Sequence, residues 1–423
     1  MSSNAMTPRG VTRRKLLLTT VGGSAAIAMP WVSRGYAAET IPVGLVVGMT
    51  GRAAPWGVSV ANAVRMVVDD INKNGGVKSK GGAKLELIIA DHQSQSALAG
   101  TLTERLIELQ KVVCVIGYAT SAASIVGSKA ADALKTPVLS TDTADDLSEQ
   151  GLQHYFRVGA KSGILAAGAV DFAIAAAKAT NVQPTKVAIM ADDTTFSQSS
   201  AKGVVRNFPR TGWKLVENVS YPGGGVSDFT SIIQRLKLTG VDLVFQATFP
   251  ADAIQITRAM KVVDYNPIAA LHVSGAPYTP DFISAVKADG DYITCSVGYV
   301  SELTRTNKLL ADFAKSYEAA YKRPLDDQAS QGCLAAGTLY DALERASDVT
   351  RDAVTKAIRE TDLEMGANPY INRDGVKFGT SGDNSRAKFI VMQLRDQQQR
   401  IVYPESLAST KLVWPMPAWN TRV

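Results

Sequence analysis

Two short turns in the front half of the chain contain residues that could bind an anion. The first turn, residues 117–124 (GYATSAAS), lies between the apolar run VVCVI and a helix-like segment. A helix that begins at such a turn leaves its first N–H groups unpaired, and these lie at the positive end of the helix dipole. An anion can therefore bind there without a charged side chain. The residue types predict an anion site that includes Ser121.

The second turn, residues 139–146 (LSTDTADD), follows the short apolar strand TPVLS and contains Thr141, Asp142 and Thr143. If the two strands are neighbours in a parallel sheet, both turns open at its carboxyl edge, where ligands of such sheets bind. Together the turns indicate a site for a small carboxylate. The alternative is that Ser121 and Thr143 only cap helices, because serine and threonine are common at helix starts.

The segments around these turns alternate between strand and helix patterns. Continuous apolar runs at 41–48, 83–91, 112–117 and 136–140 are separated by amphipathic segments. This alternation predicts a parallel sheet covered by helices on both faces. A second series of the same kind begins near residue 158, and about 385 residues are more than one core usually organises.

Three helix patterns near the end, at 307–322, 328–346 and 351–360, have no full set of strands of their own. We expect them to pack on the first unit before the chain crosses back. The predicted fold is therefore α/β, with two doubly wound parallel-sheet lobes joined by a hinge of several crossovers. A cleft between such lobes would hold a small ligand. The expected bounds are 39–157 plus 299–383 for lobe 1, and 158–298 plus 384–423 for lobe 2 with the C-terminal tail.

Residues 1–38 have the pattern of an export segment preceded by a cloning scar. Paired arginines, Arg13 and Arg14, precede a soft apolar stretch and a small-residue cleavage site near Ala37 and Ala38. This order resembles a twin-arginine signal, which predicts a periplasmic protein. A retained membrane anchor is the alternative, although the apolar stretch is short and polar for a membrane span.

The net charge of +6 arises almost entirely from this segment, which has five basic residues and no acidic one. The rest of the chain contains 40 basic and 39 acidic residues. The charge balance therefore gives no reason to expect a nucleic-acid partner.

Other residue types give little support for catalysis or metal binding. The three histidines, His92, His154 and His272, lack ligand-like spacing, and no nucleophile elbow or phosphate-binding loop is present. We therefore expect no enzyme activity, no metal and no cofactor. The three cysteines lie mostly in apolar runs and are expected to be buried free thiols, although an exported chain could oxidise a pair.

From Ile41 to about Arg395 the chain resembles the type I periplasmic solute-binding proteins of branched-chain amino-acid (Leu/Ile/Val-type) ABC transporters. Four blocks carry the resemblance in order along the chain: VGLVVGMTGRAAPWG, DDINKNGGVKSKGGAKLELIIAD, VIGYATSAAS and DFTSIIQRLKLTGVDLVF. The resemblance implies a protein, expected to be monomeric, that captures a small solute outside the cytoplasmic membrane and presents it to the permease of an importer.

The resemblance also implies roles for individual residues. Ser121 matches the serine that meets the ligand carboxylate, and Thr141 and Thr143 match the contacts to the carboxylate and amino group. Aromatic residues that line the cleft in the family, often tyrosines there, are matched by Trp56, Phe196 and Phe249. With fewer phenolic groups, the predicted cleft is drier than in the family, unless these rings belong to the ordinary core.

One departure from the family concerns the ligand's ammonium group. Amino-acid binders place Glu or Asp after the last strand of the second lobe, whereas this chain has HVSGAPY at 272–278, with Gly275 as the candidate contact. A buried ammonium without a partner would cost several kcal/mol. Either Asp142 or Asp193 takes this role, or the solute has no amino group and is an aromatic carboxylic acid.

Two other classes of function remain open at this stage, since fold does not fix function. A repressor core could share the fold, but it would need a helix-turn-helix before the first strand, where an export signal is expected instead. A sensor domain could share it too, but it would be expected to have a membrane span after Val423. An exported hydrolase is the other class, and a nucleophile and base paired in the cleft would identify it.

Overall fold

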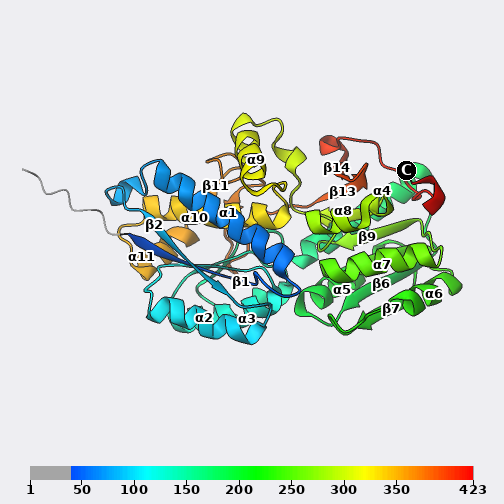
Figure 1. Ribbon diagram of the computed structural model, residues 1–423, viewed down its shortest axis with the longest axis horizontal. Coiled ribbons are helices and arrows are strands. Elements are labelled where there is room, and N and C mark those ends of the chain that lie inside the picture. Colours follow the sequence, from blue (N-terminus) through cyan, green and yellow to red (C-terminus); the bar gives the residue numbers. More distant parts are fainter. Residues whose placement is uncertain (1–39, 423) are drawn as a thin grey trace, which may run out of the picture. The chain divides into compact units, whose positions relative to one another are not determined.

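A computed structural model describes residues 40–422 of the protein. The segment predicted to be a scar and export signal, 1–38, lies outside these residues. The described part contains two predominantly parallel sheets with helices on their faces (Figure 1). Short 3-10 turns lie between the larger elements, at Lys78–Lys80, Asp145–Leu147, Phe208–Arg210, Lys287–Gly290, Ser301–Thr304, Glu405–Leu407 and Trp419–Thr421.

The first sheet has five parallel strands in the order β2-β1-β3-β4-β5. These strands are β1 Ile41–Val47, β2 Leu85–Asp91, β3 Val115–Tyr118, β4 Val138–Ser140 and β5 Tyr155–Arg157. Its helices are α1 Ala54–Lys73, α2 Ser96–Glu108 and α3 Ser121–Ala133. Because β3 and β4 are adjacent and parallel, the turns that follow them open at the same sheet edge, as the sequence predicted.

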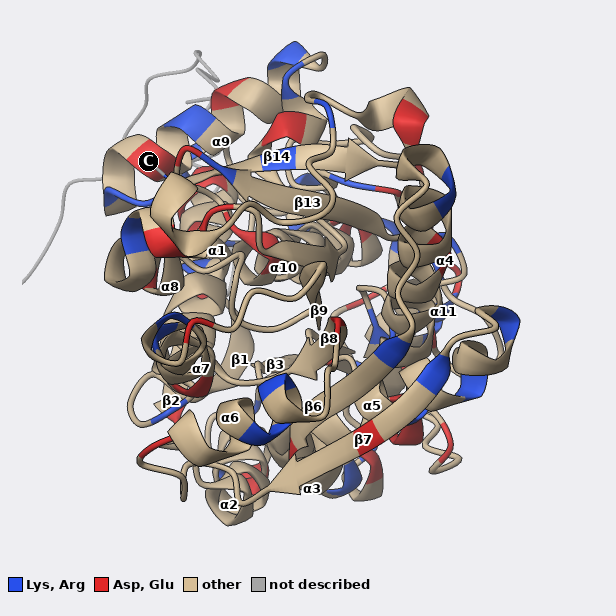
Figure 2. Cartoon of the chain, turned by 90° about the vertical axis from the view of Figure 1, so that its right-hand side faces the viewer, with Lys and Arg blue, Asp and Glu red and all other residues tan. Residues whose placement is uncertain are grey.

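The second sheet has seven strands in the order β14-β13-β10-β9-β8-β6-β7. They are β6 Lys186–Asp192, β7 Lys214–Tyr221, β8 Leu243–Ala247, β9 Ala269–Val273, β10 Thr294–Val297, β13 Ile390–Arg395 and β14 Gln398–Tyr403. Strands β6 to β10 are parallel, whereas β13 and β14 are antiparallel additions. Figure 2 shows that β8 and β9 carry no charged residue, while the edge strands β7 and β14 do. Central strands buried on both faces account for this pattern.

The helices of the second sheet are α4 Ser162–Thr180, α5 Thr195–Asn207, α6 Thr230–Leu238, α7 Pro250–Val262 and α8 Pro280–Val286. Among residues 40–422, α4 is the one helix long and apolar enough to cross a membrane. Half of that stretch is buried inside the fold, where α4 contacts β9, β10 and β13. Such a helix is also typical of a protein core.

The last helices are α9 Lys308–Tyr321, α10 Asp327–Arg345 and α11 Arg351–Arg359, followed by the small hairpin of β11 Asp362–Leu363 and β12 Val376–Lys377. Helix α10 packs along α1 and also contacts β3 and β4. The three cysteines, Cys114, Cys295 and Cys333, are buried and unpaired, as predicted. The residue bounds of the two lobes stay a prediction.

Candidate ligand-binding site

The first turn joins β3 to α3, and no side chain caps the helix. Thr120 occupies the N-cap position with an extended backbone and makes no capping hydrogen bond. The Ser121 hydroxyl does not cap the helix either, because it accepts a hydrogen bond from the Ala144 N–H of the second turn at 3.2 Å. The positive end of the α3 dipole is therefore not neutralised by its own side chains.

The second turn is fastened to the first through Asp142. The Tyr118 N–H donates to Asp142 Oδ2 at 2.8 Å, and the Ser140 hydroxyl donates to the same oxygen at 3.2 Å. Asp142 is buried, with 3% of its surface exposed. Burial raises the pKa of this carboxyl above its ordinary value, and the Tyr118 N–H opposes part of that change. These contacts hold Ser121 and Thr143 on the same side of the sheet.

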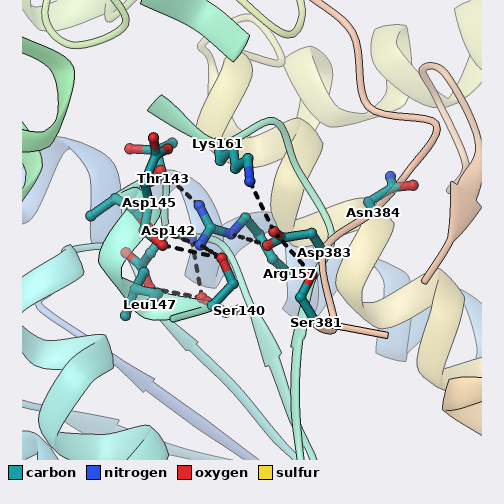
Figure 3. A network of polar contacts seen from close by, with 12 residues as sticks. Ser140, Asp142, Thr143, Asp145, Leu147, Arg157, Lys161, Ser381, Asp383 and Asn384 are labelled. Atoms are coloured by element: carbon teal, nitrogen blue, oxygen red, sulfur yellow. Dashed lines mark hydrogen bonds and ion pairs between the residues drawn. The ribbon is translucent and has the colours of Figure 1, made fainter. Parts of the chain in front are cut away.

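Arg157, at the end of β5, holds the second turn in place by hydrogen bonds to its backbone carbonyl groups (Figure 3). Its guanidinium donates to the Thr143 carbonyl at 2.7 Å and to the Ala144 carbonyl at 2.8 Å. Its Nε lies 3.1 Å from Asp383 Oδ1, and its side chain is fully buried. Arg157 was not predicted as a site residue, because a single arginine at the end of a short strand gives no sequence signal that separates it from a surface arginine.

Three aromatic side chains from both sheets' helices form an apolar cluster beside these turns. Trp56 lies 4.4 Å from Phe249 and 5.7 Å from Phe196, measured between ring centroids. The Trp56 and Phe196 rings meet edge to face, as do Phe196 and Phe249. Such pairs each contribute about 0.5–1.5 kcal/mol beyond the burial of their area. The cluster brings α1 of the first sheet against α5 and the start of α7 of the second.

A charged contact accompanies the aromatic cluster. Arg52, between β1 and α1, pairs with Asp192 at 2.9 Å and with Asp252 at 3.0 Å, both from the second sheet's elements. Its guanidinium also lies 3.9 Å from the centre of the Phe249 ring. Burial raises the pKa of Asp252, and Arg52 opposes that shift. Arg52 therefore links the elements on the two sides of the aromatic cluster.

The turns and the aromatic cluster line one pocket. Six of the nine predicted site residues line it: Trp56, Ser121, Asp142, Thr143, Phe196 and Gly275. The pocket therefore combines backbone and hydroxyl groups on one side with aromatic rings on the other. This arrangement suits a small molecule with an anionic end and an apolar body.

The other three predicted residues do not line this pocket. Phe249 packs against Trp56 and Phe196. Thr141 is fully buried, and its N–H donates to the Gly117 carbonyl at 2.7 Å. Asp193 is exposed, and its carboxylate accepts the Gly223 N–H at 2.8 Å. Of the two aspartates proposed to meet an ammonium group, Asp142 is therefore the one placed at the pocket.

The structure adds pocket residues that the sequence analysis did not single out. They are Ala119 and Thr120 of the first turn, Ser274 and Tyr278 after β9, and Gln328 of α10. The first two follow directly from the predicted turn. Gln328 lies some two hundred residues further along the chain, and no local pattern marks it. Within residues 40–422 no cluster of His, Cys, Asp or Glu could hold a metal ion, and the absence of a cofactor stays a prediction.

Comparison with known proteins decides the family. The family model described as periplasmic binding protein matches residues 40–397. The chain belongs to the periplasmic binding protein family. A curated member of similar sequence is the Leu/Ile/Val-binding protein homolog 8 of Brucella suis biovar 1, which is 26% identical over 93% of this chain and 97% of its own length. As a periplasmic binding protein, the chain is a solute-binding protein that works outside the cytoplasm.

Solved structures of similar proteins confirm the predicted fold class for this periplasmic binding protein. The leucine-binding protein LivK of Thermotoga maritima MSB8 has a TM-score of 0.74 at 19% identity, covering 86% of this chain and 98% of that one. A solute-binding protein of R. palustris in complex with benzoate has a TM-score of 0.72 at 20% identity, covering 86% and 95%. LivJ of Streptococcus pneumoniae, in complex with isoleucine, has a TM-score of 0.74 at 19% identity, covering 86% and 100%.

Proposed function

We propose that this protein is the solute-binding subunit of an ABC importer and that it takes up a small carboxylic acid with an apolar, aromatic-compatible body. The observation that carries the proposal is the uncapped start of α3, which lies beside Ser121 and Thr143 at the pocket. A carboxylate there would receive N–H and hydroxyl hydrogen bonds and the favourable end of the helix dipole. Benzoate and branched-chain amino acids, the ligands of the similar structures, all carry this group.

Two features favour an acid without an amino group. Asp142 is the one carboxylate among the described residues that line the pocket, and it already accepts hydrogen bonds from Tyr118 and Ser140. Burial raises the pKa of Asp142, which disfavours the charged form that an ammonium group would need as its partner. The amino-acid alternative rests on the same residue, because a ligand ammonium could draw Asp142 into its charged form.

Matched ligand pairs test the proposal. Thermal-shift and calorimetric titrations would compare 3-phenylpropanoate with phenylalanine, 4-methylpentanoate with leucine, and benzoate alone. We expect the acids without an amino group to raise the melting temperature, because stabilisation follows RT ln(1 + [L]/Kd). Stabilisation by the amino acids alone would establish the alternative, and no stabilisation by any acid would refute a carboxylate pocket. The substitution Asp142→Asn should weaken an amino acid and change a plain acid little.

We propose further that the two sets of elements close on the ligand, and that the pairs of Arg52 with Asp192 and Asp252 belong to the closed state. Because a ligand shifts an equilibrium only through its different affinity for the two states, the closed state must be the one that binds it more tightly. Delivery through a twin-arginine signal and a monomeric state are part of the proposal. Replacing Arg13 and Arg14 with lysine should retain the protein in the cytoplasm, as cell fractionation would show, if the export interpretation holds.

A further inference from the structure

Two residues outside the two turns bring buried polar atoms to the lining of the pocket. They are Gln328, the second residue of α10, and Trp56, near the start of α1. Gln328 lines the pocket and only 6% of its surface is exposed. Its Oε1 is buried and finds no hydrogen-bond partner within residues 40–422. This unpaired acceptor belongs to a wall of the pocket.

The two aspartates that precede Gln328 on the chain both have partners within the protein. Asp326 accepts hydrogen bonds from the Ser59 hydroxyl at 2.6 Å and from the Ala329 N–H at 2.8 Å. Asp327 pairs with Arg373 and accepts the Gly298 N–H at 3.1 Å. Both aspartates therefore serve the protein's own structure, whereas the Oε1 of Gln328 has no partner within residues 40–422.

Trp56, which also lines the pocket, carries an unpaired donor. Its indole Nε1 is buried and has no partner in the described part of the chain. Ser59, three residues later on α1, contacts Asp326, so the Trp56 and Gln328 ends of the two helices lie close together. Tyr278 also lines the pocket and is 1% exposed. Its phenol interacts with the Gln328 side chain, and burial raises the pKa of the phenol well above the ordinary value.

A ligand with only a carboxylate and an apolar body would leave these groups unpaired, which weakens binding. A hydroxyl group both donates and accepts, so it can donate to Gln328 Oε1 and accept from Trp56 Nε1. The hydroxyl group also fits if the Oε1 and Nε2 positions of the Gln328 carboxamide are exchanged, because it can then accept a hydrogen bond from Nε2. An ammonium group can only donate, and a second carboxylate can only accept.

We propose that the ligand is a hydroxy-substituted aromatic carboxylic acid whose hydroxyl group is recognised by Gln328 and Trp56. This inference rests on the proposed function, since the carboxylate must first occupy the turns at α3. It narrows the solute from small carboxylic acids to those with a second hydrogen-bonding group on the ring. Gln328 is then a residue that determines specificity rather than part of the carboxylate site.

The test is calorimetric titration of the full protein with benzoate, 3-phenylpropanoate and the mono-hydroxy isomers of each. We expect one hydroxy isomer to bind about 10- to 100-fold more tightly than its parent acid. In Gln328→Met this preference, measured as the ratio of the two affinities, should vanish, and Trp56→Phe should reduce it in the same way. Trp56→Phe keeps an aromatic ring and serves if Gln328→Met does not fold, which its melting curve would reveal.

Gln331→Met is the matched control, because Gln331 lies on the same helix with an unpaired buried Oε1 but does not line the pocket. It should keep the preference for the hydroxy acid. Equal binding of parent and hydroxy acids, or a preference that survives Gln328→Met, would overturn this inference and leave the proposed function intact. If no acid binds with or without a hydroxyl group, the proposed function fails as well.

Discussion

The starts of α3 and α10 both contribute residues to the pocket, but only the start of α10 has its backbone N–H groups capped by a side chain. At α10 the N-cap Asp326 accepts the Ala329 N–H, and Asp327 adds a second carboxylate that pairs with Arg373. At α3 no side chain caps the helix, and its first turn contains no acid. At α10 the backbone N–H groups are capped by the protein's own carboxylate, so the helix start contributes a side chain, Gln328, to the pocket. At α3 the first N–H groups have no side-chain cap, so the backbone itself is available to bind an anion.

The largest effect should follow from giving α3 the kind of cap that α10 has. Thr120→Asp would place a carboxylate at the N-cap, where aspartate is among the preferred residues. We expect the ligand-free protein to gain about 1 kcal/mol of stability. Carboxylic acids should bind more than about 100-fold more weakly, because the new carboxylate repels theirs and takes their donors. Calorimetry and thermal melting would measure the two effects.

The matched control for that change is Thr194→Ala at α5, a helix whose cap is already present. Thr194 accepts the Ser197 N–H and does not line the pocket. Its removal should cost about 1 kcal/mol of stability with little change in ligand affinity. If Thr120→Asp left affinity unchanged, the α3 start would not be the carboxylate site.

The cap of α10 should make the stability of the protein depend on pH. Burial raises the pKa of Asp326 to about 6 from its ordinary value of 3.8. Between these values the folded protein keeps a proton that the unfolded chain has released, so the free energy of unfolding falls as pH rises through this window. Above pH 6 the loss is complete and is on the order of 3 kcal/mol at most.

Asp326→Asn tests this assignment, because asparagine caps a helix equally well and does not titrate. Urea unfolding of the variant at pH 4 and pH 7 should show a smaller difference between the two values than in the unchanged protein. The same difference in both proteins would mean that Asp326 stays charged in the folded state across this range.

The smallest effect is expected from removing hydroxyl groups while the backbone of α3 stays in place. Ser121→Ala combined with Thr143→Ala should weaken carboxylate binding by about 1–3 kcal/mol through lost hydrogen bonds. Calorimetry with the best acid would measure the change. Full affinity in the double variant would leave the backbone N–H groups as the whole of the site, and a loss as large as that of Thr120→Asp would assign the site to the side chains.

The sequence predicted the local features of this pocket better than the distant ones. The turns at 117–124 and 139–146 follow from strand and helix patterns, which depend on neighbouring residues and on the pairing of β3 with β4. Gln328 and Arg157 reach the site through packing of α10 on α1 and of β5 beside β4, and a single polar residue gives no local signal of such packing.

The antiparallel pair of β13 and β14 was also not predicted, for a reason visible in its turn. Asp396 and Gln397 both adopt positive φ angles, 53° and 58°, as a two-residue hairpin turn requires. Asn-Gly or Asp-Gly is the usual sequence signal for such a turn, and Asp-Gln is a weak one. The tail after β14 then returns to the second sheet, where Gln393 contacts the Val413 backbone through both ends of its carboxamide.

A crystal structure of the protein with the carboxylic acid that stabilises it most would test the central claim directly. The account predicts a ligand carboxylate oxygen within about 3 Å of the backbone N–H of Ser121 or Ala122, with the ligand body against Trp56 and Phe196. A carboxylate held elsewhere in the pocket, with the α3 start turned to solvent, would contradict it.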